Sequence, residues 1–400
     1  MPVPINAAAL PLPLLMLIVF GSAKLFGEIF EKLGQPAIVG EILAGVIIGP
    51  GVLNWLRPEG LVLSLADLGV MFLLFRVGLE IQSSEMVRIG VRAALVAAGG
   101  VTMSFGLVWG VMTFRGYRPL EAAFVGAALA ATSVGISAQV LAGLGRDSGN
   151  SARGLLAHAA SQVVLAAAVV DDVCCLLVLA VVSSLARREV NIPGIVVTLL
   201  IAAAFVVIVA NWGSSAMRRL IPAAGNRLRI AEAEFAVAIC LLFGLALLSL
   251  WTGIAAIVGA FLAGMALADS VGDRVRTLVH GATELLVPFF LVGIGLRVDT
   301  AALGSGDLVL LAALLLTAAL VAKVAGCGLG ALSMGRLNTL RVGVAMIPRG
   351  EVTMVVAQFG LSLGAISQPV FSVVVLIAVA TTLIAPPLMK AAYAMPATPA

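Results

Sequence analysis

Charged residues are scarce in this sequence. Lysine, arginine, aspartate and glutamate together make up 11% of its 400 residues, whereas hydrophobic residues make up 62%. Soluble domains carry about 25% charged residues. A chain with less than half of that level is predicted to be an integral membrane protein, with the lipid bilayer as its surroundings.

Several sequence patterns are also absent. Ten-residue segments of alternating hydrophobicity do not appear, which argues against a β-barrel. No basic tract with interleaved aromatic residues appears, so nucleic-acid binding is not supported. No basic segment precedes the first apolar stretch, so we expect a retained span and not a cleaved signal peptide. An all-α membrane protein is the fold class that remains.

The four cysteines give no sign of a metal centre. All of them lie within apolar runs, and the adjacent pair Cys174–Cys175 has neither the spacing nor the histidine partners of a zinc site. We therefore expect buried thiols, no disulfide and no resident cofactor.

Apolar runs bounded by charge, proline or glycine predict thirteen membrane-spanning helices. Their approximate limits are 9–31, 37–54, 62–80, 91–114, 120–143, 160–184, 194–213, 232–250, 253–269, 281–297, 306–331, 339–361 and 369–392. With the N-terminus outside, fourteen of the 24 lysines and arginines fall on the cytoplasmic side and six on the external side. This imbalance predicts an external N-terminus and a cytoplasmic C-terminus.

The sequence contains an internal repeat. Residues 37–45, AIVGEILAG, match residues 256–264, AIVGAFLAG, and residues 72–81, FLLFRVGLEI, match residues 289–298, FFLVGIGLRV. Seven predicted spans separate the partners, so the two copies would cross the membrane in opposite directions. Inverted repeats are typical of secondary transporters, whose binding site lies at mid-membrane where the repeats meet. Chance similarity among helices rich in glycine and alanine is the alternative.

Two adjacent carboxylates, Asp171 and Asp172, lie near the middle of an apolar run from about Val163 to Leu185. A charge at that depth costs at least about 3 kcal/mol, so such residues usually have a function or a partner. Lys323, well inside the span 306–331, is a candidate partner for one of them. Neighbours on a helix point about 100° apart, so both aspartates cannot face the lysine. We expect one to pair with Lys323 and the other to face a water-filled cavity.

Other charged residues within spans have candidate partners on their own helices. Lys24 lies one turn before Glu28, and Arg76 lies one turn before Glu80. Such spacing favours intrahelical ion pairs with a structural role.

Two spans carry helix-breaking or polar residues at mid-depth. Thr132 and Ser133 lie in the span 120–143, and a shift of about 217 residues from Thr132 leads to the sequence Pro348–Arg349–Gly350–Glu351. Interrupted helices at corresponding positions of two repeats indicate a transporter binding site, because they free backbone carbonyls for a cation. There is an alternative for each position. Thr132 and Ser133 could reflect ordinary packing of small residues, and Pro348–Glu351 could be a simple kink with an internal ion pair.

These groups suggest a mechanism. Burial favours the protonated form of a carboxylate, and a dehydrated Na⁺ requires oxygen ligands. One carboxylate can hold a proton or a cation but not both, so competition at Asp172 would couple the two fluxes. The sequence thus predicts a transporter and not an enzyme, with Na⁺ and H⁺ as substrates.

The motifs LGQPAIVGEILAGVIIGP, FLLFRVGLE, ATSVGISAQVLAGLG, VVDDV and PRGEV, together with Lys323, resemble the bacterial sodium/proton antiporters of the cation:proton antiporter superfamily. The similarity extends from Leu33 to about Pro387 and is greatest to thirteen-span, NapA-type members, whose branch includes glutathione-gated potassium efflux systems. The resemblance implies that Asp172 is the main carrier of cation and proton. It also implies that Asp171 pairs with Lys323 and releases it when sodium binds.

The resemblance implies further expectations. Members with two aspartates are electrogenic, and Thr132, Ser133, Arg349 and Glu351 match the two unwound spans near the ion. Members are homodimers of the bacterial cytoplasmic membrane in which a core domain moves like an elevator. In this sequence the dimerisation part would comprise about 9–80 and 232–297, the ion-transporting core about 91–184 and 306–392, and a linking helix about 194–213, within one transmembrane unit over residues 1–400.

Three other functions compete with Na⁺/H⁺ antiport. A K⁺/H⁺ antiporter on the same scaffold is the main alternative, and the sequence hardly distinguishes the two. An intramembrane aspartyl protease needs aspartates that face each other across a gap, which neighbours on one helix cannot do. The inverted repeat and buried Lys323 argue against a passive channel.

Overall fold

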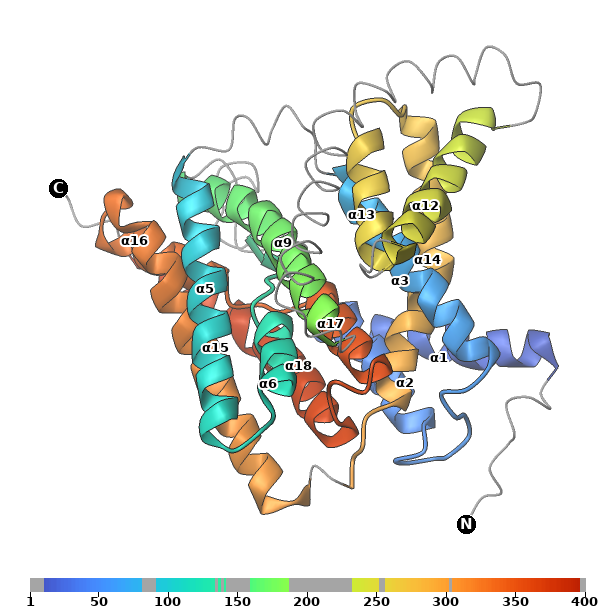
Figure 1. The fold of residues 1–400 in the computed structure, drawn as a ribbon, viewed down its shortest axis with the longest axis horizontal. Coiled ribbons are helices and arrows are strands. Elements are labelled where there is room, and N and C mark those ends of the chain that lie inside the picture. Colours follow the sequence, from blue (N-terminus) through green and yellow to red (C-terminus); the bar gives the residue numbers. More distant parts are fainter. Residues whose placement is uncertain are drawn as a thin grey trace. The chain divides into compact units, whose positions relative to one another are not determined.

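A computed structural model of the chain describes residues 11–80, 91–133, 136–137, 140–141, 159–186, 232–251, 256–301 and 304–395. Helices are the only regular secondary structure in these residues, so the predicted all-α fold is confirmed for them (Figure 1). Eight of the described helices are long and apolar enough to cross a membrane, and four shorter apolar helices accompany them. The predicted span 194–213 lies outside the described residues.

The chain forms two compact units. Unit 1 comprises residues 1–88 and 183–297. Its described helices are α1 (Leu12–Lys32), α2 (Ala37–Ile48), α3 (Leu61–Glu80), α12 (Ala233–Trp251), α13 (Ala256–Leu267) and α14 (Asp273–Leu296). Within this unit α14 packs against α1, α2 and α3, and α13 packs between α3 and α12.

Unit 2 comprises residues 89–182 and 298–400. Its described elements are α5 (Val91–Phe114), α6 (Pro119–Ala128), α9 (Ala159–Ala186, of which the last residues belong to unit 1), α15 (Gly306–Gly330), the short 3₁₀ helix η4 (Leu332–Met334), α16 (Arg336–Ala345), α17 (Glu351–Ser362) and α18 (Gln368–Ala394). Figure 1 shows α5 beside α15 over most of their length, and α15 and α16 also pack against α18.

The internal repeat is visible in how unit 1 packs. Gly45 of α2 lies against the backbone of Val292 in α14, and Gly295 of α14 lies against Ile42 in α2, so closely that a Cβ on either glycine would collide. The corresponding glycines of the other copies make the same contact between α13 and α3, where Gly264 meets Phe75 and Gly78 meets Phe261. Each first helix of one copy therefore packs on the second helix of the other. Only glycine permits backbones to approach so closely.

The repeat extends into unit 2. The short helices α6 and α16 start at Pro119 and Arg336 and end at Ala128 and Ala345, which are the same 217 residues apart. Both are followed by non-helical backbone: residues 131–133 after α6, and residues 347–350 between α16 and α17. Pro348 accounts for the second break, since its ring excludes helix at the preceding residue.

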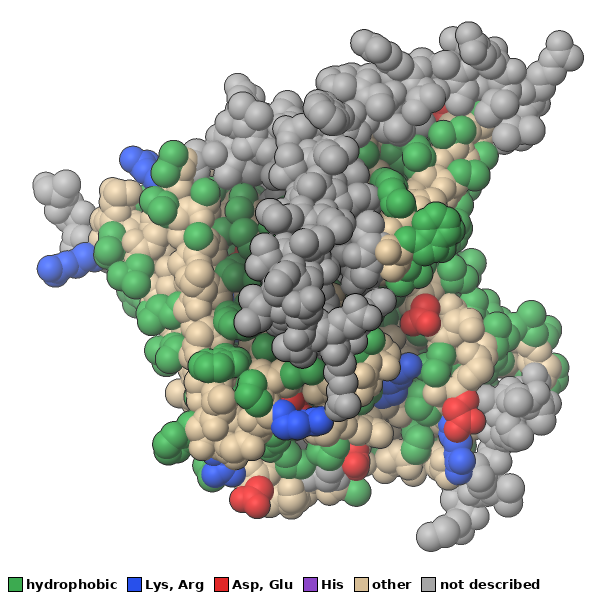
Figure 2. Space-filling model, in the orientation of Figure 1, with side chains coloured by type: hydrophobic (Ala, Val, Ile, Leu, Met, Phe, Trp, Pro, Cys, Tyr) green, Lys and Arg blue, Asp and Glu red, His purple; other side chains and the backbone are tan. Residues whose placement is uncertain are grey.

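Many large hydrophobic side chains are exposed on the surface of the described residues. Figure 2 shows hydrophobic side chains over much of the visible described surface, with few and scattered charges. Leu17 and Leu25 of α1, Phe114 of α5 and Trp251 of α12 are among the exposed large side chains. A surface of this composition is suited to contact with lipid tails.

Two expectations about charged residues and helix ends are wrong. Lys24 does not pair with Glu28: its Nζ lies 3.3 Å from both Glu41 and Glu284, while Glu28 pairs with Lys32. The partners come from α2 and α14, and packing between helices outweighs the neighbour one turn away. Arg76 contacts Glu284 at 3.6 Å, and the Glu80 side chain lies outside the described residues.

The second error concerns α14. This helix begins at Asp273, eight residues before the predicted limit of 281. The predicted limit is too late because it follows the apolar run, and the first two turns of the helix contain several polar residues. Hydrophobicity marks where a helix enters the apolar layer and not where its hydrogen bonding begins.

Candidate cation site

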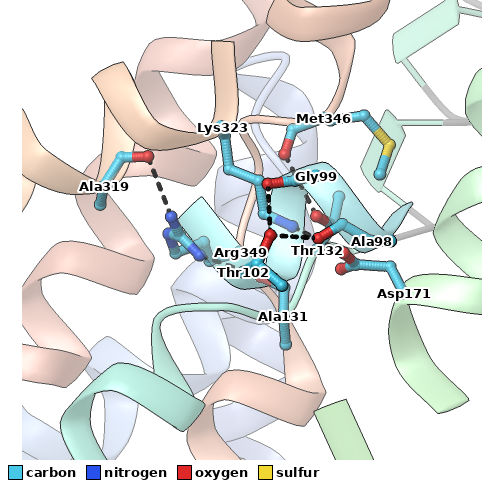
Figure 3. Close-up of polar contacts among 10 residues, drawn as sticks. All are labelled: Ala98, Gly99, Thr102, Ala131, Thr132, Asp171, Ala319, Lys323, Met346 and Arg349. Carbon is cyan, nitrogen blue, oxygen red and sulfur yellow. Dashed lines mark hydrogen bonds and ion pairs between the residues drawn. The ribbon is translucent and has the colours of Figure 1, made fainter. Parts of the chain in front are cut away.

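The central contact of the site joins α15 to α9. Nζ of Lys323 donates a hydrogen bond to Oδ1 of Asp171 at 2.8 Å, and neither side chain has any exposed surface. Figure 3 shows the two side chains reaching toward each other from their helices. Removing both charges from water is costly, so the short contact is needed to offset the loss of hydration.

Asp172 follows Asp171 on α9 and is 4% exposed. A helix turns about 100° per residue, so its carboxylate leaves the helix in a different direction from that of Asp171. The structure thus brings Lys323 together with Asp171, and places a second buried carboxylate beside that pair.

Thr132 and Ser133 lie in the non-helical backbone after α6, and both are 2% exposed. Thr132 Oγ1 donates to the carbonyl oxygen of Met346 at 3.2 Å, and the backbone N–H of Ser133 donates to that of Pro348 at 2.8 Å. The two non-helical segments of unit 2 are therefore hydrogen-bonded to each other.

This geometry affects how Thr132 can act. A threonine hydroxyl has one proton and two lone pairs. Since the proton is directed to Met346, the lone pairs of Thr132 remain available to a cation. In this orientation the hydroxyl oxygen would be able to act as a neutral ligand.

Arg349, in the segment between α16 and α17, is fully buried. Its guanidinium donates to the carbonyl oxygens of Ala131 at 3.2 Å and Ala319 at 3.0 Å, and it is close enough to Asp171 to interact with its charge. Figure 3 shows the Ala319 contact, which joins this segment to α15 one turn before Lys323. Glu351 is the first residue of α17, and its side chain lies outside the described residues.

The surroundings of Lys323 are close-packed. Gly100 of α5 faces the lysine, because a Cβ there would lie 3.4 Å from Nζ and 2.5 Å from Sγ of Cys327. Cys175 and Cys327 are buried free thiols, as the sequence predicted, but the prediction is wrong for the other two cysteines, because Cys174 is half-buried and Cys240 of α12 is exposed. An environment of thiols and small side chains excludes water, which strengthens every charge–charge interaction inside it.

Sequence reasoning missed two hydroxyls. Ser137 Oγ donates to the carbonyl oxygen of Ala345 at 2.8 Å, and Thr382 Oγ1 of α18 donates to that of Arg349 at 2.8 Å. Neither residue carries a charge or breaks a helix, so nothing in the sequence distinguishes them from the other hydroxyls in apolar spans.

Comparison with known proteins identifies related sequences. The family model for "Sodium/hydrogen exchanger, transmembrane" matches residues 15–391. The chain is 32% identical over 378 residues to the Na(+)/H(+)-K(+) antiporter GerN of Bacillus cereus, covering 92% of this chain and 93% of that protein. It is 33% identical over 423 residues to the high-affinity Na(+)/H(+) antiporter NhaS3 of Synechocystis, covering 94% of this chain and 89% of that protein.

A solved structure is also similar. The sodium proton antiporter MjNhaP1 from Methanocaldococcus jannaschii superposes with a TM-score of 0.67 over 94% of this chain and 95% of that chain. The sequence identity is 17%. At that identity the match shows that the two chains share a fold.

Proposed function

This chain belongs to the sodium/hydrogen exchanger family, and from that premise we propose that it is an electrogenic secondary transporter that exchanges Na⁺ or Li⁺ for H⁺. The family resemblance predicted from the sequence motifs is confirmed, and the family supports cation/proton exchange by a multi-pass membrane protein. The choice of Na⁺, the stoichiometry, the carrier residue and the mechanism of movement are parts of the proposal.

The observation that carries the proposal is the buried contact between Lys323 and Asp171 beside Asp172. The resemblance of VVDDV to the family's motif is the reason we assign the transported ion to the second aspartate, Asp172, and the pairing with Lys323 to Asp171, whose Oδ1 lies 2.8 Å from Nζ of the lysine. A proton or a Na⁺ would each neutralise Asp172, and each would exclude the other. Exchange follows because only a loaded site can cross between the two sides.

The ligands for Na⁺ would be oxygen atoms, since it is a hard cation. The oxygens that fit this requirement are those of the Asp172 and Asp171 carboxylates and of the Thr132 hydroxyl. Ser133 follows Thr132 in the same segment. When Na⁺ approaches Asp171, Lys323 would lose its partner and its stabilisation as a cation. Release of a proton from Lys323 would then make exchange electrogenic, with more than one H⁺ per Na⁺.

The two units would have different tasks. We assign ion transport to unit 2, which contains every site residue named above, and dimerisation to unit 1. Alternating access would occur by an elevator movement of unit 2, and the non-helical segments after α6 and α16 would be breaks within two crossing spans of a thirteen-span protein. The proposed setting is a bacterial cytoplasmic membrane, with the N-terminus outside.

K⁺/H⁺ antiport is the second candidate, and two observations favour it. The name of the Bacillus cereus relative includes K⁺, and the chain is 28% identical over 289 residues to the glutathione-regulated potassium-efflux protein KefC of Escherichia fergusonii. That match covers 71% of this chain and 44% of KefC.

The test uses purified protein in vesicles that contain a pH-sensitive dye. Pulses of Na⁺ or Li⁺ should move protons across the vesicle membrane, and a pulse of K⁺ should move fewer protons. Asp172→Asn should abolish this movement, and Asp67→Asn, the same change on α3 of unit 1, should not. Proton movement that persists in Asp172→Asn would remove Asp172 as the carrier, and a response to K⁺ alone would establish the second candidate.

A further inference from the structure

The last residue of α16 and the backbone between α16 and α17 are held by hydroxyl groups from other parts of unit 2. Three carbonyl oxygens accept these hydrogen bonds: that of Ala345 from Ser137, that of Met346 from Thr132 and that of Arg349 from Thr382. Two of the donors belong to the segment that follows α6. The third, Thr382, comes from the middle of α18 and is 1% exposed.

Thr382 differs from other threonines within helices. A threonine in a helix usually donates to a carbonyl three or four residues earlier on its own helix. Thr381, the preceding residue, does so with Ala378 at 3.0 Å, and Thr317 of α15 does so with Ala313 at 2.8 Å. Thr382 instead directs its proton to Arg349.

The bond acts on the peptide from which the Arg349 guanidinium extends. That guanidinium joins Ala131, in the segment after α6, to Ala319, one turn before Lys323 on α15. Thr382 therefore fixes the backbone of Arg349. The guanidinium of Arg349 in turn connects its own segment to the segment after α6 and to α15. Without this bond, the Arg349 carbonyl would be a buried acceptor without its partner, and the segment would shift to find another.

We propose that Thr382 is a positioning residue of the ion site: its hydroxyl holds the segment between α16 and α17 so that Thr132 and Lys323 keep the geometry that binds the cation. This inference rests on the proposed exchange function. Thr382 acts through Arg349 and does not touch the ion. Its loss should thus weaken ion binding more than it slows the movement of a loaded site.

The experiment compares exchange in vesicles for the wild type, Thr382→Val, Thr382→Ser and the control Thr381→Val. Valine keeps the branched shape of threonine and removes the donor. Thr382→Val should raise the KM for Na⁺ or Li⁺ about three- to tenfold, the effect of one lost hydrogen bond, with a much smaller change in maximal rate. Thr382→Ser should restore the wild-type KM, and Thr381→Val should leave it unchanged.

The outcomes separate this inference from the function on which it rests. If the wild type shows no cation-dependent proton movement, the proposed function is wrong. If the wild type exchanges ions but Thr382→Val has an unchanged KM, or Thr381→Val shifts it equally, the positioning role is wrong. Should Thr382→Val fail to fold, Thr382→Ala also removes the donor, and a KM for that variant equal to that of the wild type would overturn the proposal.

Discussion

Nζ of Lys323 lies 2.8 Å from Oδ1 of Asp171, and water reaches neither side chain. Two opposite charges buried in this way depend on each other, because removal of one leaves the other without compensation at a cost of about 3–5 kcal/mol. We predict that Lys323→Met and Asp171→Asn each lower the free energy of unfolding by an amount of this order. The double variant should lose much less than the two single losses combined.

Chemical unfolding of the four proteins in detergent measures this coupling. A matched control is the pair of Arg115 and Asp307, also in unit 2, whose groups lie 3.7 Å apart with side chains 30% and 95% exposed. Exposed pairs contribute about 0–1 kcal/mol, so the Arg115→Met and Asp307→Asn cycle should show little coupling. Equal coupling in both cycles would contradict the assignment of a buried pair.

The contact between α5 and α15 yields a second prediction. Gly99 and Gly326 face each other so closely that a Cβ on either would collide with the carbonyl of the other. Gly326→Ala should therefore push α15 away from α5 and destabilise the protein by about 1–3 kcal/mol. Because Lys323 lies one turn away on α15, cation affinity should fall as well.

Gly110→Ala is the control for this change. Gly110 is also on α5, but apart from its chain neighbours and the backbone of its own helix nothing in the described residues lies within 4 Å of the position of its added Cβ. Alanine is the better helix former by up to about 1 kcal/mol, so this variant should be as stable as the wild type or more stable. Thermal unfolding of both variants tests this prediction. A Gly326→Ala protein with wild-type stability would show that the helices can separate without cost.

The sequence predicts most of this fold for identifiable reasons. Long apolar runs define α5, α15 and α18 to within a few residues, because in these helices the apolar layer and the hydrogen-bonded segment nearly coincide. The 217-residue offset located Arg349 from Thr132 because the repeat preserves the position of the break as well as the apolar pattern. Charge in an apolar run likewise indicated Asp171, Asp172 and Lys323.

Other features depend on packing that no single segment encodes. Nothing near Lys24 in the sequence indicates that its partners are Glu41 and Glu284, since these residues meet only after α1, α2 and α14 assemble. Thr382 was missed for the same reason. A hydroxyl in an apolar helix gives no sign of whether it donates to its own helix, as Thr381 does, or to another element.

The charges of unit 1 provide a third prediction. Lys24 contacts both Glu41, whose side chain is 8% exposed, and Glu284, which also contacts Arg76. Lys24→Met should leave the Glu41 carboxylate buried without its cation and lower the free energy of unfolding by about 1–3 kcal/mol. High salt should reduce the loss less than it would for a fully exposed pair, because the Glu41 side chain is only 8% exposed although that of Lys24 is 40% exposed.

Lys32→Met is the same substitution on the same helix and serves as the control. Lys32 pairs with Glu28 one turn away, and their side chains are 73% and 57% exposed. Such a pair contributes about 0.3–0.5 kcal/mol, most of which salt removes. If both variants unfold alike, the Lys24 network contributes no more than a surface pair.

The final prediction concerns pH. If one carboxylate, Asp172, holds either Na⁺ or H⁺, the Na⁺ concentration for half-maximal exchange must rise as protons become more abundant. Displacement of the Asp172 proton alone limits this rise to tenfold per pH unit, whereas release of the Lys323 proton as well, which the electrogenic mechanism requires, raises the limit to a hundredfold per pH unit. Transport currents with Na⁺ and Li⁺, at equal pH on both sides of the membrane, measure the concentration directly.

Both ions should show the same slope with different intercepts, since the proton competes at the same group whichever cation is present. Asp67→Asn, which changes a carboxylate of unit 1, should leave the slope intact. The contrary result is a maximal rate that falls as the pH is lowered while the half-maximal Na⁺ concentration stays constant. It would show that protons act at another group, and the shared-carrier mechanism would then be wrong.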